Sequence, residues 1–127
     1  MKTAKKLGVW MDHSMAHLME FSSEPFEIRT IESTFKNQDK KESLAASERL
    51  MHQKQQELQA MYYKKIGNAL KDFYHVVLFG PTDAKLELYN LLQEDPRFRE
   101  TKMEIKDTDK MTSRQIQAFV REYFSKA

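Results

Sequence analysis

The chain has 127 residues, enough for one compact domain and too few for two ordinary ones, so we expect a single domain over residues 1–127. Its 40% apolar and 31% charged residues are typical of a helix-rich globular protein, and the absence of Cys excludes disulfides, thiol nucleophiles and thiolate metal sites. The net charge of +2 is close to neutral, and no run approaches the roughly 18 apolar residues of a membrane span or resembles a secretory signal, so we expect a cytoplasmic protein with no membrane partner.

The first elements are predicted to be two strands joined by a tight turn. Residues 7–11 (LGVWM) and 15–21 (MAHLMEF) have the apolar character of strands. Asp12, His13 and Ser14 lie between them, and Asp and Ser commonly hydrogen-bond the backbone in turns. Residues 26–31 (FEIRTI) alternate in polarity, which predicts a half-exposed strand at a sheet edge.

A long helix is predicted next, over about residues 40–72. Asp39 followed by Glu42 matches a helix start signal. Apolar residues are sparse in the first half of this segment and dense in the second, where a core stripe is predicted at Met61, Tyr62, Ile66 and Leu70. We therefore expect the N-terminal half of the helix to project from the core.

The rest of the chain is predicted to form two strand–helix units. Residues 75–80 (HVVLFG) are continuously apolar, as in a central strand that is covered on both faces. Thr82 or Asp83 can cap the following helix, whose inward stripe is predicted at Ala84, Leu88, Leu91 and Leu92. Residues 101–106 (TKMEIK) alternate like an edge strand. Thr112 and Gln115 match a capping box ahead of a last core stripe at Ile116, Phe119, Val120 and Tyr123.

The predicted element order is β-β-β-α-β-α-β-α. An antiparallel meander followed by right-handed crossovers favours a mixed five-stranded sheet in the order 3-2-1-4-5, with helices on its faces. This is an α/β fold of the ribonuclease H-like class. It places the apolar fourth strand in the centre and the alternating third and fifth strands at the edges.

Candidate catalytic and metal-binding residues are few. Asp12 lies at the end of the first strand, where a two-metal nuclease of this fold holds a carboxylate, but the fourth strand supplies no second acid. His13 and His17 lie on turn and strand, which does not give the i, i+4 zinc geometry of one helix. The sequence also lacks nucleophile-elbow and phosphate-loop motifs. We expect no cofactor, no metal and no catalytic residue, and any chemical role of Asp12 or His13 stays open.

The middle of the chain is more basic than either end. Residues 1–35 carry four basic and five acidic groups, residues 36–71 eight and four, and residues 72–127 nine and ten. The excess of +4 in the middle indicates an anionic partner such as RNA, although a solvated helix face has the same composition. The candidate RNA-contacting residues are Lys36, Gln38, Lys40, Lys41, Arg49 and Lys54.

Three segments carry a resemblance to a known group of proteins. GVWMDHSMAHLMEF (8–21), VLFGPTDAKLEL (77–88) and DKMTSRQIQAFVREYF (109–124) are similar to small bacterial translational machinery proteins. These resemble the middle domain of archaeal and eukaryotic class 1 release factors and of Pelota. The resemblance covers about residues 7–124 and implies a role in translation.

The segment that joins the third strand to the long helix sets this chain apart from release factors. There, release factors carry a Gly-Gly-Gln motif that promotes peptidyl-tRNA hydrolysis, whereas this chain has STFKNQDKKES (33–43), with Gln38 but neither glycine. The resemblance therefore implies binding at the ribosome or its RNA, as in Pelota, in rescue, hibernation or stress, with no DNA partner. The alternative is a protein-interaction module that self-associates through the long helix or an edge strand.

Overall fold

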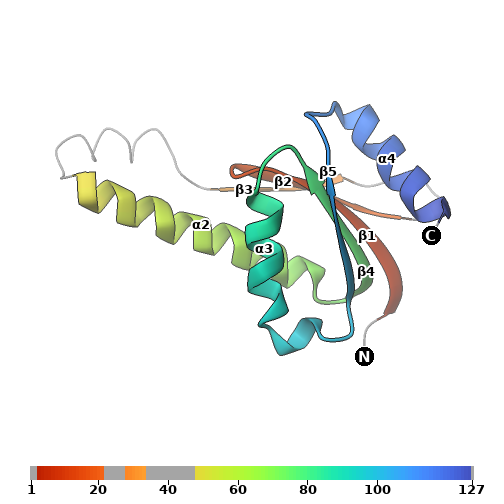
Figure 1. Ribbon diagram of the computed structural model, residues 1–127, viewed down its shortest axis with the longest axis horizontal. Helices are drawn as coiled ribbons and strands as arrows, with labels where there is room; N and C mark the ends of the chain where they lie inside the picture. Colours follow the sequence, from red (N-terminus) through yellow and green to blue (C-terminus); the bar gives the residue numbers. More distant parts are fainter. Residues whose placement is uncertain (1–2, 22–27, 34–47, 127) are drawn as a thin grey trace.

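The computed structural model describes residues 3–21, 28–33 and 48–126, which form one mixed sheet with helices on both faces (Figure 1). The strands are β1 (Thr3–Met11), β2 (Met15–Glu20), β3 (Ile28–Glu32), β4 (Phe73–Gly80) and β5 (Lys102–Asp107). The helices in these residues are α2 (Glu48–Leu70), α3 (Ala84–Gln93) and α4 (Ser113–Lys126), with a short 3-10 helix at Pro96–Phe98.

The strands lie in the order β3-β2-β1-β4-β5. β2 is antiparallel to both β1 and β3, whereas β4 is parallel to both β1 and β5. Trp10 of β1 lies between His17 of β2 and Phe79 of β4 in the register of the sheet. The predicted α/β fold with its mixed five-stranded sheet is therefore confirmed.

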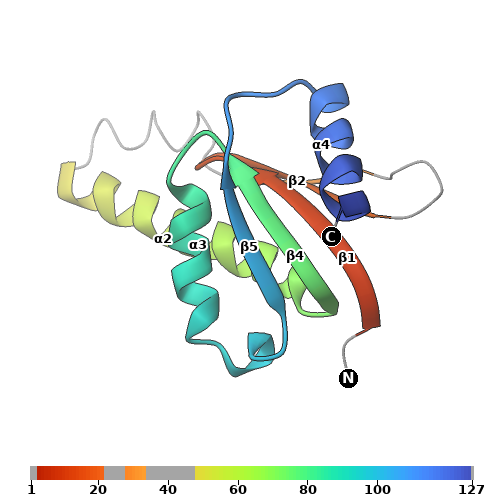
Figure 2. The ribbon, with the colours of Figure 1, turned by 45° about the vertical axis from the view of Figure 1, so that its right-hand side comes forward.

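β4 is covered on both faces because its side chains alternate between two buried clusters. Val76 and Leu78 belong to a cluster with residues of α2 and α3, on what we call the α2/α3 face. Val77 and Phe79 belong to a cluster with residues of α4, on the α4 face. Figure 2 shows the two groups of helices on opposite sides of the sheet. The continuous apolar run at 75–80 thus indicated a central strand correctly.

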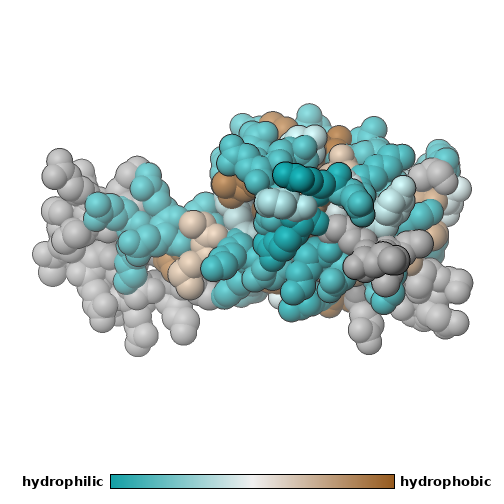
Figure 3. All heavy atoms as spheres, turned by 90° about the horizontal axis from the view of Figure 1, so that it is seen from below, coloured by the Kyte–Doolittle hydropathy of each residue, from teal (hydrophilic) through white to brown (hydrophobic). Residues whose placement is uncertain are grey.

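Only the C-terminal half of α2 packs on the sheet. Tyr62, Ile66 and Leu70 are buried at i, i+4 spacing, whereas no residue from 53 to 60 is buried. The N-terminal half extends beyond the sheet (Figure 1) and is predominantly hydrophilic on the face shown in Figure 3. The predicted projection is confirmed, and the predicted helix start near residue 40 lies outside the described residues. Within the described residues, no helix combines the length and apolar character needed to cross a membrane.

Two residues that the sequence assigned to the core are half exposed. Met61 and Leu91 each leave 52% of their surface accessible. At 3.6 residues per turn, Met61 lies on the far side of α2 from the stripe at Tyr62 and Ile66. Leu91 lies at the margin of its stripe on α3, because Lys85 joins Ala84, Leu88 and Leu92 as the buried residues of this helix.

α4 begins with the capping box that the sequence predicts. The backbone N–H of Gln115 donates to Thr112 Oγ1 at 3.2 Å, and the N–H of Thr112 donates to Gln115 Oε1 at 2.9 Å. The helix buries Ile116, Val120 and Phe124, whereas Phe119 and Tyr123, predicted to be core residues, are partly buried at its margin. A Cβ atom on Gly8 of β1 would lie 2.3 Å from Val120 Cγ2, so glycine lets α4 lie close to the sheet.

Candidate functional site

Asp12 holds the turn between β1 and β2. Its Oδ1 accepts hydrogen bonds from the backbone N–H groups of Ser14 at 2.7 Å and Met15 at 2.8 Å. Its own N–H donates to the carbonyl oxygen of Met15 at 3.0 Å. The predicted turn is therefore confirmed, and the Asp12 carboxylate has a structural role in it. Across residues 3–21, 28–33 and 48–126, no group of three or more His, Asp and Glu side chains is placed to hold a metal ion.

His13 belongs to a network that joins this turn to two helices. Its Nε2 lies 3.3 Å from Glu87 Oε2 on α3, and the hydroxyl of Tyr63 on α2 donates to Glu87 Oε1 at 2.6 Å. The hydroxyl of Tyr62 donates to the carbonyl oxygen of Asp12 at 2.9 Å. The hydrogen bond from Tyr63 lowers the pKa of Glu87, and burial raises the pKa values of both tyrosines. The network fixes the direction of α2 relative to the sheet.

Lys85 is buried at the start of α3, with 1% of its surface exposed. Its Nζ donates to the carbonyl oxygen of Thr82 at 2.6 Å and lies 2.8 Å from Asp107 Oδ1 at the end of β5. The ammonium group thus ties the turn after β4 to the last residue of β5. Sequence reasoning missed Lys85, although its spacing of three residues from Leu88 places it on the buried stripe of the helix.

The predicted RNA-contacting residues lie on and before the projecting half of α2. Arg49 and Lys54 belong to the helix itself, and Lys54 is half-buried. Lys36, Gln38, Lys40 and Lys41 lie outside the described residues. Further along α2, Lys64 and Lys65 are exposed. The grouping of the six predicted residues into one binding surface therefore stays a prediction.

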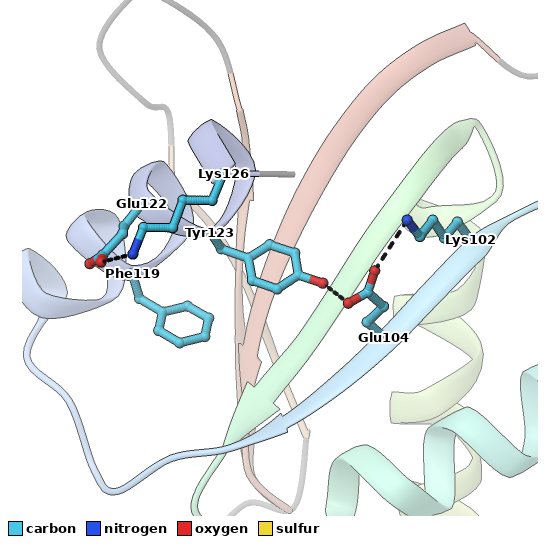
Figure 4. A pocket seen from close by; sticks show the side chains of 6 residues that line it. All are labelled: Lys102, Glu104, Phe119, Glu122, Tyr123 and Lys126. Carbon is cyan, nitrogen blue, oxygen red and sulfur yellow. Dashed lines mark hydrogen bonds and ion pairs between the residues drawn. The ribbon is translucent and has the colours of Figure 1, made fainter.

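A cavity of about 480 Å³ lies between β5 and α4 (Figure 4), and we call it the β5–α4 pocket. It is lined by Lys102, Glu104, Phe119, Glu122, Tyr123 and Lys126. The hydroxyl of Tyr123 points from α4 toward β5 and donates to Glu104 Oε2. Lys102 Nζ lies 3.5 Å from Glu104 Oε1, and Lys126 Nζ lies 2.9 Å from Glu122 Oε1. The ring of Phe119 stacks on that of Phe79, with 4.2 Å between centroids.

His75 contacts the same carboxylate from β4. It is 4% exposed, and its Nε2 lies 3.2 Å from Glu104 Oε1. Burial lowers the pKa of His75, and this effect outweighs the opposing influence of Glu104. Hydrogen bonds from Tyr123 and then from His75 lower the pKa of Glu104. Sequence reasoning missed this group, because residues on β4, β5 and α4 meet only when the two strands pair.

The hydrogen-bonded residues around Asp12, Glu87 and Lys85 differ in possible function from the residues that line the β5–α4 pocket. The residues around Asp12, Glu87 and Lys85 bond to one another and to the backbone, an arrangement that sets the geometry of the turn and of α2 and α3. The β5–α4 pocket instead has open volume beside aromatic rings, charged side chains and the edge of the sheet, which is an arrangement that can bind a ligand.

No protein-family model and no curated protein sequence matches this chain. Its structure is similar to that of Archaeoglobus fulgidus Pelota, with a TM-score of 0.60 and 13% identity over 93% of this chain and 31% of that one. Thermoplasma acidophilum Pelota gives a TM-score of 0.58 and 17% identity, over 94% and 32% of the two chains. The archaeal translation termination factor aRF1 gives 0.58 and 13%, over 91% and 33%. The chain shares their fold.

This similarity concerns architecture. The chain spans about a third of the length of each of these three proteins, and the sequence identities are 13 to 17%. The resemblance to Pelota and to class 1 release factors that the sequence indicates is therefore confirmed at the level of the fold.

Proposed function

We propose that this chain is a non-catalytic, cytoplasmic protein of translation that binds the ribosome or its RNA. The observation that supports this most is the fold shared with Pelota and an archaeal translation termination factor over more than nine tenths of the chain. Within translation, we propose a role in ribosome rescue, hibernation or the stress response. Gln38 without the two preceding glycines fits binding rather than peptide release.

The projecting half of α2 and the residues before it are the proposed contact surface. This half extends beyond the sheet, none of residues 53–60 is buried, and Arg49 and Lys54 lie on it. A polar helix in this position can contact a large polyanion without disturbing the core. Lys36, Gln38, Lys40 and Lys41 precede α2 in the sequence and are proposed as further contacts, and contacts from Lys and Arg to phosphates make binding salt-dependent.

Charge reversal tests this surface. In one variant Lys40, Lys41 and Arg49 are each replaced by Glu. In the control variant, three exposed residues far from α2 in sequence, Arg99, Lys110 and Arg114, are replaced by Glu, which changes the net charge equally.

Sedimentation of ribosomes at low and moderate salt is the measurement. We expect the wild-type and control proteins to sediment with ribosomes at low salt and the α2 variant to stay at the top of the gradient. A wild-type protein that stays at the top from growing and starved cells alike contradicts the proposal. If both variants lose binding equally, ribosome binding depends on the net charge of the protein rather than on the residues in and before α2.

The competing function is self-association through α2 or an edge strand. β3 favours it, because this strand lies at an edge of the sheet and exposes four of its five residues. Analytical ultracentrifugation separates the two functions. A dimer that forms with rising protein concentration and is indifferent to salt and RNA supports self-association.

A further inference from the structure

The outer edge of β5 and the β5–α4 pocket form a surface that the proposed function does not use. β5 is the last strand of the sheet, and within the described ranges no strand pairs with its outer edge. Such an edge presents backbone N–H and C=O groups that an added strand can bond. The pocket lies beside this edge, because Lys102 and Glu104 of β5 line one wall and residues of α4 line the other (Figure 4).

We propose that an extended segment of a partner protein binds here as an additional strand along β5. Strand addition gains affinity from main-chain hydrogen bonds and specificity from a pocket for alternate side chains. Every second residue of the added strand points to the α4 face. There the nearly parallel rings of Phe119 and Tyr123, with an interplanar angle of 13°, border a cavity of about 480 Å³. This cavity suits a large apolar or aromatic side chain.

The charged residues of β5 determine which residues of the added strand should flank the side chain that enters the β5–α4 pocket. Lys102, Glu104 and Lys106 occupy alternate positions and therefore share one face of the strand. Glu104 already accepts from Tyr123 and His75, whereas Lys106 is exposed and forms no ion pair within the described part of the chain. An apolar residue opposite Glu104 places the residues two positions away opposite the two lysines. Acidic residues at both positions complete the match.

The same face disfavours a second copy of this chain as the occupant. In the antiparallel pairing that a two-fold axis perpendicular to the sheet produces, an added β5 turns its own Lys102, Glu104 and Lys106 toward the α4 face, and these are charged where the pocket is aromatic. A heterologous segment with the pattern acidic-x-aromatic-x-acidic satisfies both the pocket and the lysines. The partner class is therefore an acidic, extended peptide with one large apolar residue.

The peptide acetyl-Thr-Glu-Val-Phe-Val-Glu-Thr-amide is the probe, titrated into the full-length protein labelled with nitrogen-15. We expect chemical-shift changes at residues 102–107 and 119–126, and slower hydrogen exchange of the β5 amides that do not donate to β4. The same peptide with Ala in place of Phe is expected to bind at least about tenfold more weakly.

Charge swapping tests the flanking contacts. Lys106→Glu alters an exposed side chain and is expected to weaken binding by about threefold or more. A peptide in which Lys replaces only the Glu residue opposite position 106 should recover binding to this variant, and each Glu is replaced in turn because the direction of the peptide decides which one lies there. Lys65→Glu on exposed α2 surface is the matched control and should bind the original peptide like the wild type.

Three results overturn the proposal. The first is the absence of shifts at β5 and α4 at millimolar peptide, and the second is equal binding of the Phe and Ala peptides. The third is protection of the β5 edge that grows with protein concentration in the absence of peptide, which identifies a second copy as the occupant. Because ribosome binding is tested with substitutions in and before α2, either proposal can fail while the other stands.

Discussion

Among residues 3–21, 28–33 and 48–126, sixteen buried residues form one cluster on the α2/α3 face of the sheet, whereas only seven form the cluster on the α4 face. Both clusters use side chains of β1 and β4, but of the described helices α2 and α3 cover the first face and α4 covers the second. On the first face the polar groups bond to one another, and the cavity there, between α2 and α3, is the smaller one, at about 250 Å³. The second keeps a cavity and charged side chains beside β5. The comparison shows that the two faces of one sheet can be filled to different degrees, and the proposed peptide site lies beside the less completely filled face.

The largest effect is expected from a side-chain truncation in the large buried cluster of the α2/α3 face. Leu78 is fully buried there, and Leu78→Ala should lower the free energy of unfolding by about 3 kcal/mol, because the tightly filled cluster cannot collapse around the missing atoms. Urea denaturation followed by circular dichroism measures this change. Leu86→Ala, at a residue that is 42% exposed, is the control and should change stability by less than about 0.5 kcal/mol. A loss below about 1 kcal/mol for Leu78→Ala would mean that this face is loosely packed.

The next effect tests how closely α4 lies on its face. Gly8→Ala places a methyl group 2.3 Å from Val120 Cγ2, so α4 must shift, at a cost of about 2 kcal/mol. Adding Val120→Ala removes the atoms that clash. We expect the double variant to be more stable than the sum of the single effects by about 1 kcal/mol, as measured in a double-mutant cycle by urea denaturation. Strict additivity would show that α4 does not meet β1 through this pair.

As the pH falls, the contribution of the α4 face to the free energy of unfolding should be lost before that of the α2/α3 face. The pKa of His75 is lowered from 6.5 in the folded protein, so the unfolded chain binds more protons below that pH. The stability that depends on neutral His75 is present above pH 6.5 and is lost as the pH falls through the folded-state pKa. The pKa of Glu87 is lowered from 4.5, so its contribution on the α2/α3 face is lost only below pH 4.5.

Denaturation series at several pH values check this order. His75→Leu should flatten the dependence of stability on pH between about pH 7 and pH 5, where histidine titrates. Glu87→Gln should leave that range unchanged and alter only the more acidic one. A wild-type protein of constant stability across the histidine range would contradict the order of the two faces.

The smallest effect is expected at Lys85. Its buried ammonium group is paired with exposed Asp107, and methionine has a similar shape without the charge. Replacement of a buried ion pair member by an apolar side chain of similar volume is often neutral when the partner can turn to water. Lys85→Met should therefore change the free energy of unfolding by less than about 1 kcal/mol, measured as for Leu78→Ala. A loss of several kcal/mol would show that Lys85 is essential to the packing of the α2/α3 face.

The fold was largely predictable from the sequence, because its signals are local. The apolar run at 75–80, the turn at Asp12 and the capping box of Thr112 and Gln115 each specify one element, and right-handed crossovers restrict the order of the strands. The periodicity of apolar residues wrongly predicted that Leu91 is buried. The buried stripe of α3 includes Lys85 instead. A charged residue on an apolar stripe is ordinarily assigned to the surface.

The candidate sites were less predictable, because they depend on residues far apart in the chain. His75 and Glu104 meet through the pairing of β4 with β5, and Tyr123 reaches them from α4. No spacing in the sequence predicts that these three residues meet. The basic residues before α2 were found from local charge alone, and four of the six predicted contacts lie outside the described residues.

The single tryptophan gives the α4 face an optical signal of its own. Trp10 is 7% exposed, and its Nε1 has no hydrogen-bond partner in the described part of the chain, so its emission should be shifted to the blue. Its ring centroid lies 5.5 Å from that of His17, close enough for a protonated imidazole to quench it. Departure of α4 from the sheet would shift the emission to the red while α2 and α3 remain in place. Fluorescence can therefore follow one side of this sheet without interference from the other.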